Sequence, residues 1–299
     1  GRFYHQGREI HLVDLPGTYS LAAQSPEEVI ARDYILSGEP DVVLNIVDAT
    51  NLERNLNLTL QILELTDRVV VALNLIDEVE RQGQEIDVAK LEADLGVPVV
   101  PTVAIEGQGL PEMLEAVLAV ADGRTQNDPV SVDYGVTIEG YIERLREDIA
   151  RVCESDRSRW LALELLEDDP GVVGAFQQGD LTRLALAASN PPAQTMRALL
   201  GRAVRLREGI RPDAKVEIVR RRYGVAHDIV HRVLRRTRAE DDSLTERVDR
   251  IVTHRLWSWP ITVPVFAVIF WITVKGGEIA GGWLDQGFSW LIGAIRQWL

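Results

Sequence analysis

Residues Leu12 to Leu21 read L-V-D-L-P-G-T-Y-S-L, an apolar run that ends at an acidic residue, a proline and a glycine. This run predicts a strand from Glu9 to Val13, which places Asp14 at the carboxyl end of the strand. There Asp14 can contact Mg²⁺ through its water shell, as the Walker-B aspartate does in P-loop nucleotidases. Gly17 has no Cβ, so its backbone N–H can approach a γ-phosphate closely. D-x-x-G alone, however, favours an ordinary strand followed by a Pro-Gly turn.

A second polar motif follows the next run that is typical of a buried strand. The β-branched run from Val69 to Leu73 leads into N-L-I-D, which contains Asn74 and Asp77. Asp77 can accept hydrogen bonds from N1–H and the exocyclic amine of guanine, and Asn74 can bond the other edge of the base. Adenine lacks that donor pair and would leave a buried Asp77 unpaired, which is how polar sites discriminate between ligands. The order of the two motifs indicates a guanine-nucleotide site.

Three stretches then resemble one family. They are D-L-P-G-T-Y-S-L from Asp14, S-P-E-E-V-I-A-R-D-Y-I-L from Ser25, and V-V-L-N-I-V-D-A-T-N-L-E-R-N-L-N-L-T-L-Q from Val42 to Gln61. The sequence resembles the bacterial ferrous iron transport protein B family over its whole length. This resemblance implies a cytosolic GTP-binding domain, a helical spacer domain that relays the nucleotide state, and a polytopic domain that carries Fe²⁺ across the cell inner membrane.

The resemblance also implies ligands and site residues. The ligands are GTP or GDP and Mg²⁺, with Asp14 as the Mg²⁺ contact through water and Gly17 on the γ-phosphate. Asn74 and Asp77 select guanine. Ala104 stands where the family usually has a small hydroxyl residue whose backbone contacts the base, and Ala104 can still make such a contact.

The expected fold is α/β: an incomplete P-loop-type G domain, then an all-α spacer domain, one transmembrane helix and an amphipathic helix. Strands are predicted at residues 2–5, 9–13, 41–47, 69–73 and 97–102, and helices at 26–36, 51–65, 88–95 and 110–120. The sequence contains no G-x-x-x-x-G-K-[ST] motif. We therefore expect the sheet to lack the first G-domain strand, which leaves two strand edges unpaired. We also expect this chain alone to hydrolyse GTP poorly or not at all, since the P-loop is absent and Thr18 replaces a water-orienting Gln.

Charge divides the chain. Residues 1–124 contain 8 Lys and Arg against 22 Asp and Glu, a balance of −14, whereas residues 125–299 contain 24 of each. This predicts a G domain at 1–123, a helical spacer domain at 124–250 and a membrane segment at 251–299. Such an acidic surface argues against nucleic acid as a partner.

An uncharged run of 19 residues extends from Leu256 to Val274, between Arg255 and Lys275. As a helix it would be roughly 28 Å long, close to the thickness of a bilayer's hydrocarbon core. Residues 197–255 carry 16 Lys and Arg against 9 Asp and Glu, which is typical of a positive-inside signal. We expect a transmembrane helix here, with a buried soluble helix as the alternative, and an interfacial amphipathic helix at about 279–299.

Metal-binding patterns are sparse in the sequence. His227 and His231 are four residues apart on a predicted helix, but the pattern lacks a third ligand, so a solvated basic face is the simpler interpretation. Cys153 is the single cysteine, which excludes a disulfide within the chain. The expected partners are the lipid bilayer, a guanine nucleotide, and either further copies of the chain or further transporter segments.

The preferred interpretation is part of a GTP-regulated Fe²⁺ transporter in which residues Pro16–Ser37 form a moving switch. Two alternatives stay open. One is a membrane-anchored signalling GTPase without a pore, which iron uptake by cells would separate from a transporter. The other is a nucleotide-free scaffold that needs a P-loop in trans, which nucleotide binding would separate from the first two.

Overall fold

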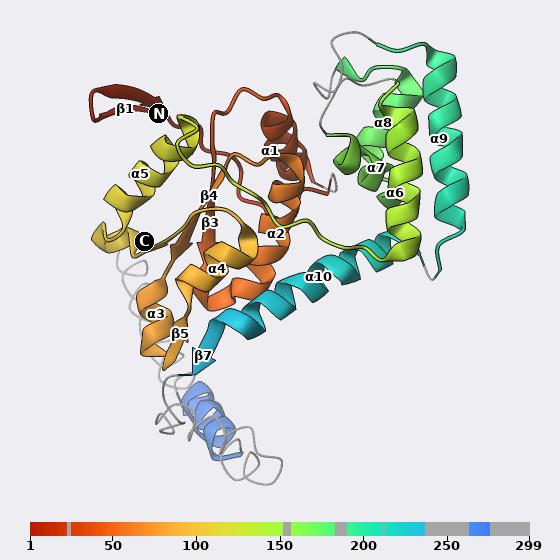
Figure 1. Ribbon diagram of the computed structural model, residues 1–299. Coiled ribbons are helices and arrows are strands. Elements are labelled where there is room, and N and C mark those ends of the chain that lie inside the picture. Colours follow the sequence, from red (N-terminus) through yellow and green to blue (C-terminus); the bar gives the residue numbers. More distant parts are fainter. Residues whose placement is uncertain (23–24, 152–156, 183–189, 212, 237–262, 276–299) are drawn as a thin grey trace, which may run out of the picture. The chain divides into compact units, whose positions relative to one another are not determined.

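The computed structural model describes residues 1–299 except 23–24, 152–156, 183–189, 212, 237–262 and 276–299 (Figure 1). The chain divides into two compact units, residues 1–237 and residues 238–299. The first unit contains an α/β part followed by helices.

The α/β part contains an exposed hairpin and a separate, buried parallel sheet. Strands β1 (Arg2–His5) and β2 (Arg8–His11) make an antiparallel hairpin. Strands β3 (Val43–Asp48), β4 (Val69–Asn74) and β6 (Val99–Thr102) make a parallel sheet in the order β3-β4-β6. Neither strand of the hairpin pairs with β3, among the residues that the structure describes.

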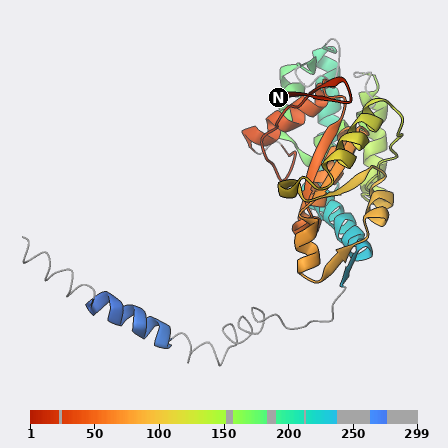
Figure 2. The same cartoon turned by 90° about the vertical axis from the view of Figure 1, so that its left-hand side faces the viewer.

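The hairpin lies instead beside the last helix of the α/β part, α5 (Leu110–Ala121), as Figure 2 shows. Arg8 donates a hydrogen bond of 2.5 Å to Asp122, the residue that follows α5, and Gln6 donates one of 3.1 Å to Glu115. These contacts are exposed, so they fix the orientation of the hairpin more than they stabilise the fold.

The predicted helices of this part form where periodicity and capping place them. They are α1 (Pro26–Leu36), α2 (Leu52–Leu65), α4 (Val88–Leu95) and α5. Ser25 begins α1 with a reciprocal capping box to Glu28, and the side chain of Asp87 caps α4 by accepting from the backbone of Lys90. Helix α2 packs on β3, α4 on β6, and α5 on both β4 and β6. Strand β4 is accordingly buried almost completely, as expected for a central parallel strand.

Three short elements were not predicted. They are α3 (Ile76–Arg81), β5 (Gln84–Ile86) and β7 (Leu234–Arg236). Strand β5 pairs antiparallel with β7. The region that was predicted to be helical up to residue 250 therefore contains a strand at residues 234–236, the last residues described there. Helix α3 begins without a side-chain cap, and β5 and β7 each contain a single apolar residue, so no local pattern marks these elements.

The helical part of the first unit comprises α6 (Val136–Ile149), α7 (Ser158–Glu167), α8 (Pro170–Gln178), α9 (Ala193–Glu208) and α10 (Ala214–Val233). Helices α6, α7 and α9 pack against one another around buried aliphatic side chains. Figure 1 shows that α10 leaves this bundle and extends along the α/β part, where it packs on α2 and α4 before β7 pairs with β5.

The second unit contains one described helix, residues 263–275, whose side chains are exposed. At 1.5 Å per residue it is about 20 Å long, shorter than a hydrocarbon core of about 30 Å. Within the described ranges, no helix is both long enough and apolar enough to cross a membrane. The structure therefore does not support the transmembrane helix predicted at Leu256–Val274. Residues 256–262 of that prediction, and the amphipathic helix predicted at about 279–299, lie outside the described residues.

Candidate functional site

The carboxyl ends of the three parallel strands meet at one edge of the sheet. In the register of the sheet, Asp48 at the end of β3 lies opposite Asn74 at the end of β4, and Asn74 lies opposite Thr102 at the end of β6. Ligands of open α/β sheets bind outside the carboxyl ends of the strands. We call the group of Asn74, Asp77, Thr102 and Ala104 at this edge the guanine edge.

Asn74 is held by two donors at the guanine edge. Its Oδ1 atom accepts a hydrogen bond of 3.0 Å from the backbone N–H of Ala104 and one of 3.3 Å from the hydroxyl of Thr102. Because both donors act on Oδ1, the Nδ2 group of the amide is directed away from them. The structure thus brings together Asn74 and Ala104, two of the predicted site residues.

A tight loop after β6 positions the Ala104 N–H. Val103 and Gln108 exchange backbone hydrogen bonds of 3.1 and 3.2 Å, which close the loop around the 3₁₀ turn Ala104–Glu106. Gly109 then begins α5 with a φ of +78°, and a Cβ atom there would lie 2.2 Å from the carbonyl oxygen of Pro101. Only glycine fits this position, so the loop geometry is fixed by sequence.

Asp77 lies in the first turn of α3, immediately beyond β4. Leu75, between Asn74 and α3, adopts a left-handed conformation with φ of +64°, which turns the chain sharply from strand to helix. The Oδ2 atom of Asp77 accepts from the guanidinium of Arg81. Its Oδ1 atom is buried and has no hydrogen-bond partner among the described residues. A buried acceptor without a partner costs free energy, and a donor supplied by a ligand would offset this cost.

Asp14 and Gly17 are not part of this group in the structure. Strand β2 ends at His11, two residues before the predicted end at Val13, although Leu12 is still hydrogen-bonded to the backbone of Gly1. From Leu12 to Ser20 the chain forms neither helix nor strand, and Asp14 is exposed. A Cβ atom at Gly17 would meet nothing within 4 Å, so no protein atom in the described residues requires glycine there.

The residues that follow Gly17 are bound to α2. The guanidinium of Arg54 lies 3.8 Å from the centre of the Tyr19 ring. The side-chain oxygen of Gln61 accepts from the hydroxyl of Ser20 at 3.2 Å and from the backbone of Leu21 at 3.0 Å. Helix α2 therefore holds the beginning of the segment that the sequence predicts to be a switch.

Asp48 belongs to the same edge of the sheet, but the sequence did not single it out. It accepts hydrogen bonds of 2.7 and 2.8 Å from Thr50 and one of 2.8 Å from Asn51. Burial opposes its charged form, yet the hydrogen bonds from Asn51 and Thr50 prevail and lower the pKa of Asp48. These contacts begin the turn into α2. The pattern D-x-T directly after a strand is a capping signal that would have revealed this role.

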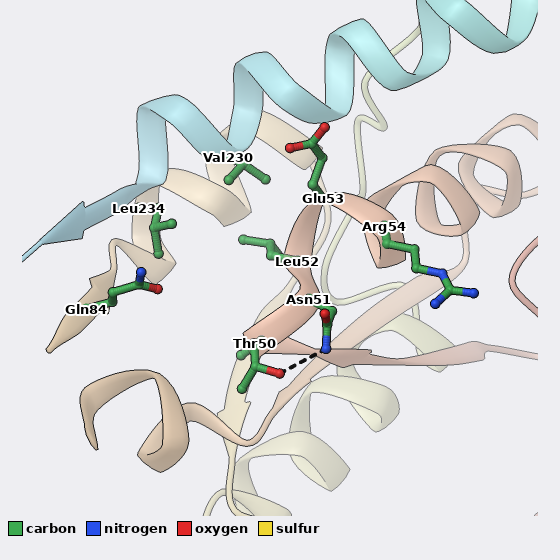
Figure 3. A pocket seen from close by; sticks show the side chains of 9 residues that line it. Thr50, Asn51, Leu52, Glu53, Arg54, Gln84, Val230 and Leu234 are labelled. Atoms are coloured by element: carbon green, nitrogen blue, oxygen red, sulfur yellow. Dashed lines mark hydrogen bonds between the residues drawn. The ribbon is translucent and has the colours of Figure 1, made fainter. Parts of the chain in front are cut away.

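A cavity of about 280 Å³ lies between the start of α2 and the end of α10 (Figure 3). It is lined by residues 49–54, Gln84, Val230 and Leu234, and none of the predicted site residues is among them. At its rim, Glu53 lies 3.2 Å from the Nδ1 atom of His227, whose ring contacts that of His231. No group of three His, Cys, Asp or Glu side chains in the described part of the chain has an arrangement that could hold a metal ion. Through Glu53, His227 forms a contact between α10 and α2. Cys153 lies outside the described residues.

Comparisons with known proteins agree with this architecture. Residues 1–117 match the family model described as ferrous iron transport protein B, and residues 134–235 match that of the FeoB cytosolic helical domain. A crystal structure of the cytosolic domain of the T. maritima FeoB iron transporter in a GDP form is 30% identical, with a TM-score of 0.61 over 79% of this chain and 84% of that one. A GDP-bound point mutant of the S. thermophilus FeoB G-domain is 33% identical, with a TM-score of 0.63 over 74% of this chain and 80% of that one.

Curated relatives extend the similarity to the whole chain. The Fe(2+) transport protein A/Fe(2+) transporter FeoB fusion protein of Porphyromonas gingivalis is 37% identical, and the Fe(2+) transporter FeoB of Salmonella typhimurium is 36% identical, each over 100% of this chain. The chain spans 35% and 37% of the length of these relatives.

The fold is that of a G domain with an adjoining helical cytosolic domain. The chain belongs to the ferrous iron transport protein B family.

Proposed function

We propose that this chain is the guanine-nucleotide-binding cytosolic part of a transporter that carries Fe²⁺ across the cell inner membrane. The observation that carries the nucleotide assignment is the buried Oδ1 atom of Asp77, which has no partner in the described structure. Guanine supplies two adjacent donors to a carboxylate, whereas adenine supplies none at the same positions. The solved relatives that contain GDP support the same assignment.

The other site residues take roles that follow from their positions. Asn74, fixed by Thr102 and Ala104, would present its Nδ2 group to the base. Asp14 would hold Mg²⁺ through water and Gly17 would contact the γ-phosphate, once phosphate oxygens complete the coordination of the ion. Bound nucleotide and Mg²⁺ supply the charge that a switch segment senses. Residues Pro16–Ser37 would be that switch.

Transport itself is proposed from the relatives, which are named Fe(2+) transporters. We propose a G domain at 1–123, a helical spacer domain at 124–250 and a membrane segment at 251–299, with the first two in the cytoplasm. Contacts with the lipid bilayer and between copies of the chain belong to this proposal. Iron uptake by cells that carry the whole gene, compared with a deletion strain, tests it against a signalling GTPase without a pore.

The nucleotide assignment is tested by titrating the full chain with fluorescent GDP and GTP. Saturable binding by the wild type, at least tenfold weaker in Asp77→Ala, is the expected result, because the variant loses two hydrogen bonds to a charged group. Asp41→Ala, which removes an exposed carboxylate in the loop before β3, is the matched control and should bind like the wild type. Equal affinities of the wild type and Asp77→Ala would contradict the assignment. No binding by the wild type would favour the scaffold.

A further inference from the structure

The one cationic side chain that the described structure places on Asp77 is Arg81, four residues later in α3. Its guanidinium donates to Oδ2 of Asp77 and, through its other nitrogen, to a carboxylate oxygen of Glu78 at 2.5 Å. The two contacts fix the guanidinium between both acidic residues of the first turn. The carboxylate of Asp77 is therefore held at Oδ2, while its buried Oδ1 atom has no hydrogen-bond partner in the described residues.

This asymmetry suits a base with two donors. A carboxylate oxygen has two lone pairs, so Oδ2 can accept from Arg81 and from one donor of guanine together, while Oδ1 accepts from the other. We propose that Arg81 is a positioning residue for guanine recognition: it sets the rotation of the Asp77 carboxylate and so determines how well the site distinguishes a base with an exocyclic amine. This inference rests on the proposed guanine site and adds a residue to it.

An ordinary helical ion pair looks different in the same molecule. On α10, Glu217 uses one carboxylate oxygen for Arg220 and the other for Arg221, so both oxygens have partners. The Asp77–Arg81 pair leaves one oxygen unused and buried. The side chain of Arg81 is 63% exposed, and exposed pairs contribute little to stability, so removing it should leave the fold intact.

The test compares GDP with inosine diphosphate, which lacks the exocyclic amine, in titrations of the full chain. In the wild type the ratio of the two affinities measures the hydrogen bond between that amine and Asp77. Arg81→Ala should lower this ratio about three- to tenfold, the range of one hydrogen bond, by weakening GDP more than inosine diphosphate. Arg81→Lys, which keeps a donor to Oδ2, should retain most of the ratio. Arg220→Ala, which removes an equally exposed helical pair, should leave it unchanged.

The outcomes separate this inference from the proposed function. If Asp77→Ala leaves the GDP affinity unchanged, or the wild type binds no GDP, both are wrong. If Asp77→Ala removes the discrimination but Arg81→Ala does not, the guanine site stands and the positioning role is overturned. An equal loss of both affinities in Arg81→Ala would indicate only a structural contribution to α3, and a gain in GDP affinity would indicate that Arg81 competes with the base. Either result overturns the inference.

Discussion

Buried carboxylate oxygens lie both at the guanine edge and at the junction of α2 with α7 and α10. Only at the junction do donors from the protein hydrogen-bond to these oxygens. At the junction Arg222 of α10 donates to Glu64 of α2 at 3.3 Å and to Glu167 of α7 at 3.0 Å, and the hydroxyl of Tyr134 also donates to Glu64. At the guanine edge Asp77 keeps one oxygen buried without a partner in the described residues. Glu64 and Glu167 thus accept from donors within the protein, whereas Oδ1 of Asp77 does not. One buried atom of the junction, Nε of Arg222, also lacks a partner in the described residues.

A second ion pair repeats the pattern of the junction. Arg32 of α1 lies 3.0 Å from Asp169, and the two side chains are only 1% and 2% exposed. Asp169 also caps α8 by accepting from the backbone of Val172 at 2.8 Å. Buried charges are tolerated only when paired, so these pairs fix how the helices meet. The pairs at the junction connect helices of the α/β part with helices of the helical part, and α1 belongs to the proposed switch segment. The unpaired oxygen of Asp77 belongs to the proposed ligand site.

The largest expected effect comes from breaking the junction with Arg222→Met. The variant leaves Glu64 and Glu167 buried without their shared cation, which should lower the free energy of unfolding by about 3–5 kcal/mol. Urea unfolding measures the change. Arg220→Met, an exposed neighbour on the same helix, should cost less than about 0.5 kcal/mol. A loss of under about 1 kcal/mol in Arg222→Met would show that the junction does not depend on this ion network.

The sequence predicted the elements and the guanine edge better than the junction, for a physical reason. Capping residues and periodicity are local, so the bounds of α1 and α4 were predicted to the residue. The motif that begins at Asn74 lies at the carboxyl end of β4, beside Thr102 of β6, and its role as a guanine site stays a prediction. Arg222 and Glu64 are 158 residues apart, and no local pattern relates them. From the sequence, Arg222 was counted among the basic residues of a positive-inside signal, whereas its side chain is buried.

Other misses follow from the same limit. The contact of Arg81 with Asp77 depends on α3, a helix of six residues that periodicity does not reveal. Strand β7 forms because β5 offers it an edge, which is a tertiary condition. The strand predicted to reach Val13 ends at His11. Local preference decides the long elements, and available partners decide the short ones.

A smaller effect at the junction depends on pH. Burial raises the pKa of Glu164 well above its ordinary value, and the charges of Glu167 and Asp169 raise it further, although Arg222 and Arg32 oppose them. A carboxyl whose pKa is raised by folding destabilises the protein at a pH above that raised value. The cost diminishes as the pH falls through it, because the folded state then takes up the proton.

Glu164→Gln removes this titration. The variant should be about 1 kcal/mol more stable than the wild type at pH 8, and the advantage should shrink steadily as the pH is lowered towards about 5. Urea unfolding across this range measures it. Glu143→Gln, an exposed substitution on α6, should follow the wild-type curve at every pH. A Glu164→Gln variant with the same stability difference at both ends of the range would show that the raised pKa has no part in folding.

The smallest expected effect probes how firmly the guanine edge is held. Thr102→Val replaces the hydroxyl that donates to Asn74 by a methyl group of similar shape, while the Ala104 N–H remains on the same oxygen. Because the longer of two hydrogen bonds is lost, stability should fall by about 0.5 kcal/mol and GDP affinity by about two- to threefold. Asn74→Ala, which removes the amide itself, should lower the GDP affinity at least tenfold. If Thr102→Val lowered the GDP affinity as much as Asn74→Ala, the Thr102 hydroxyl rather than the Ala104 N–H would orient the amide. The loop around Gly109 would then have no role in positioning Asn74.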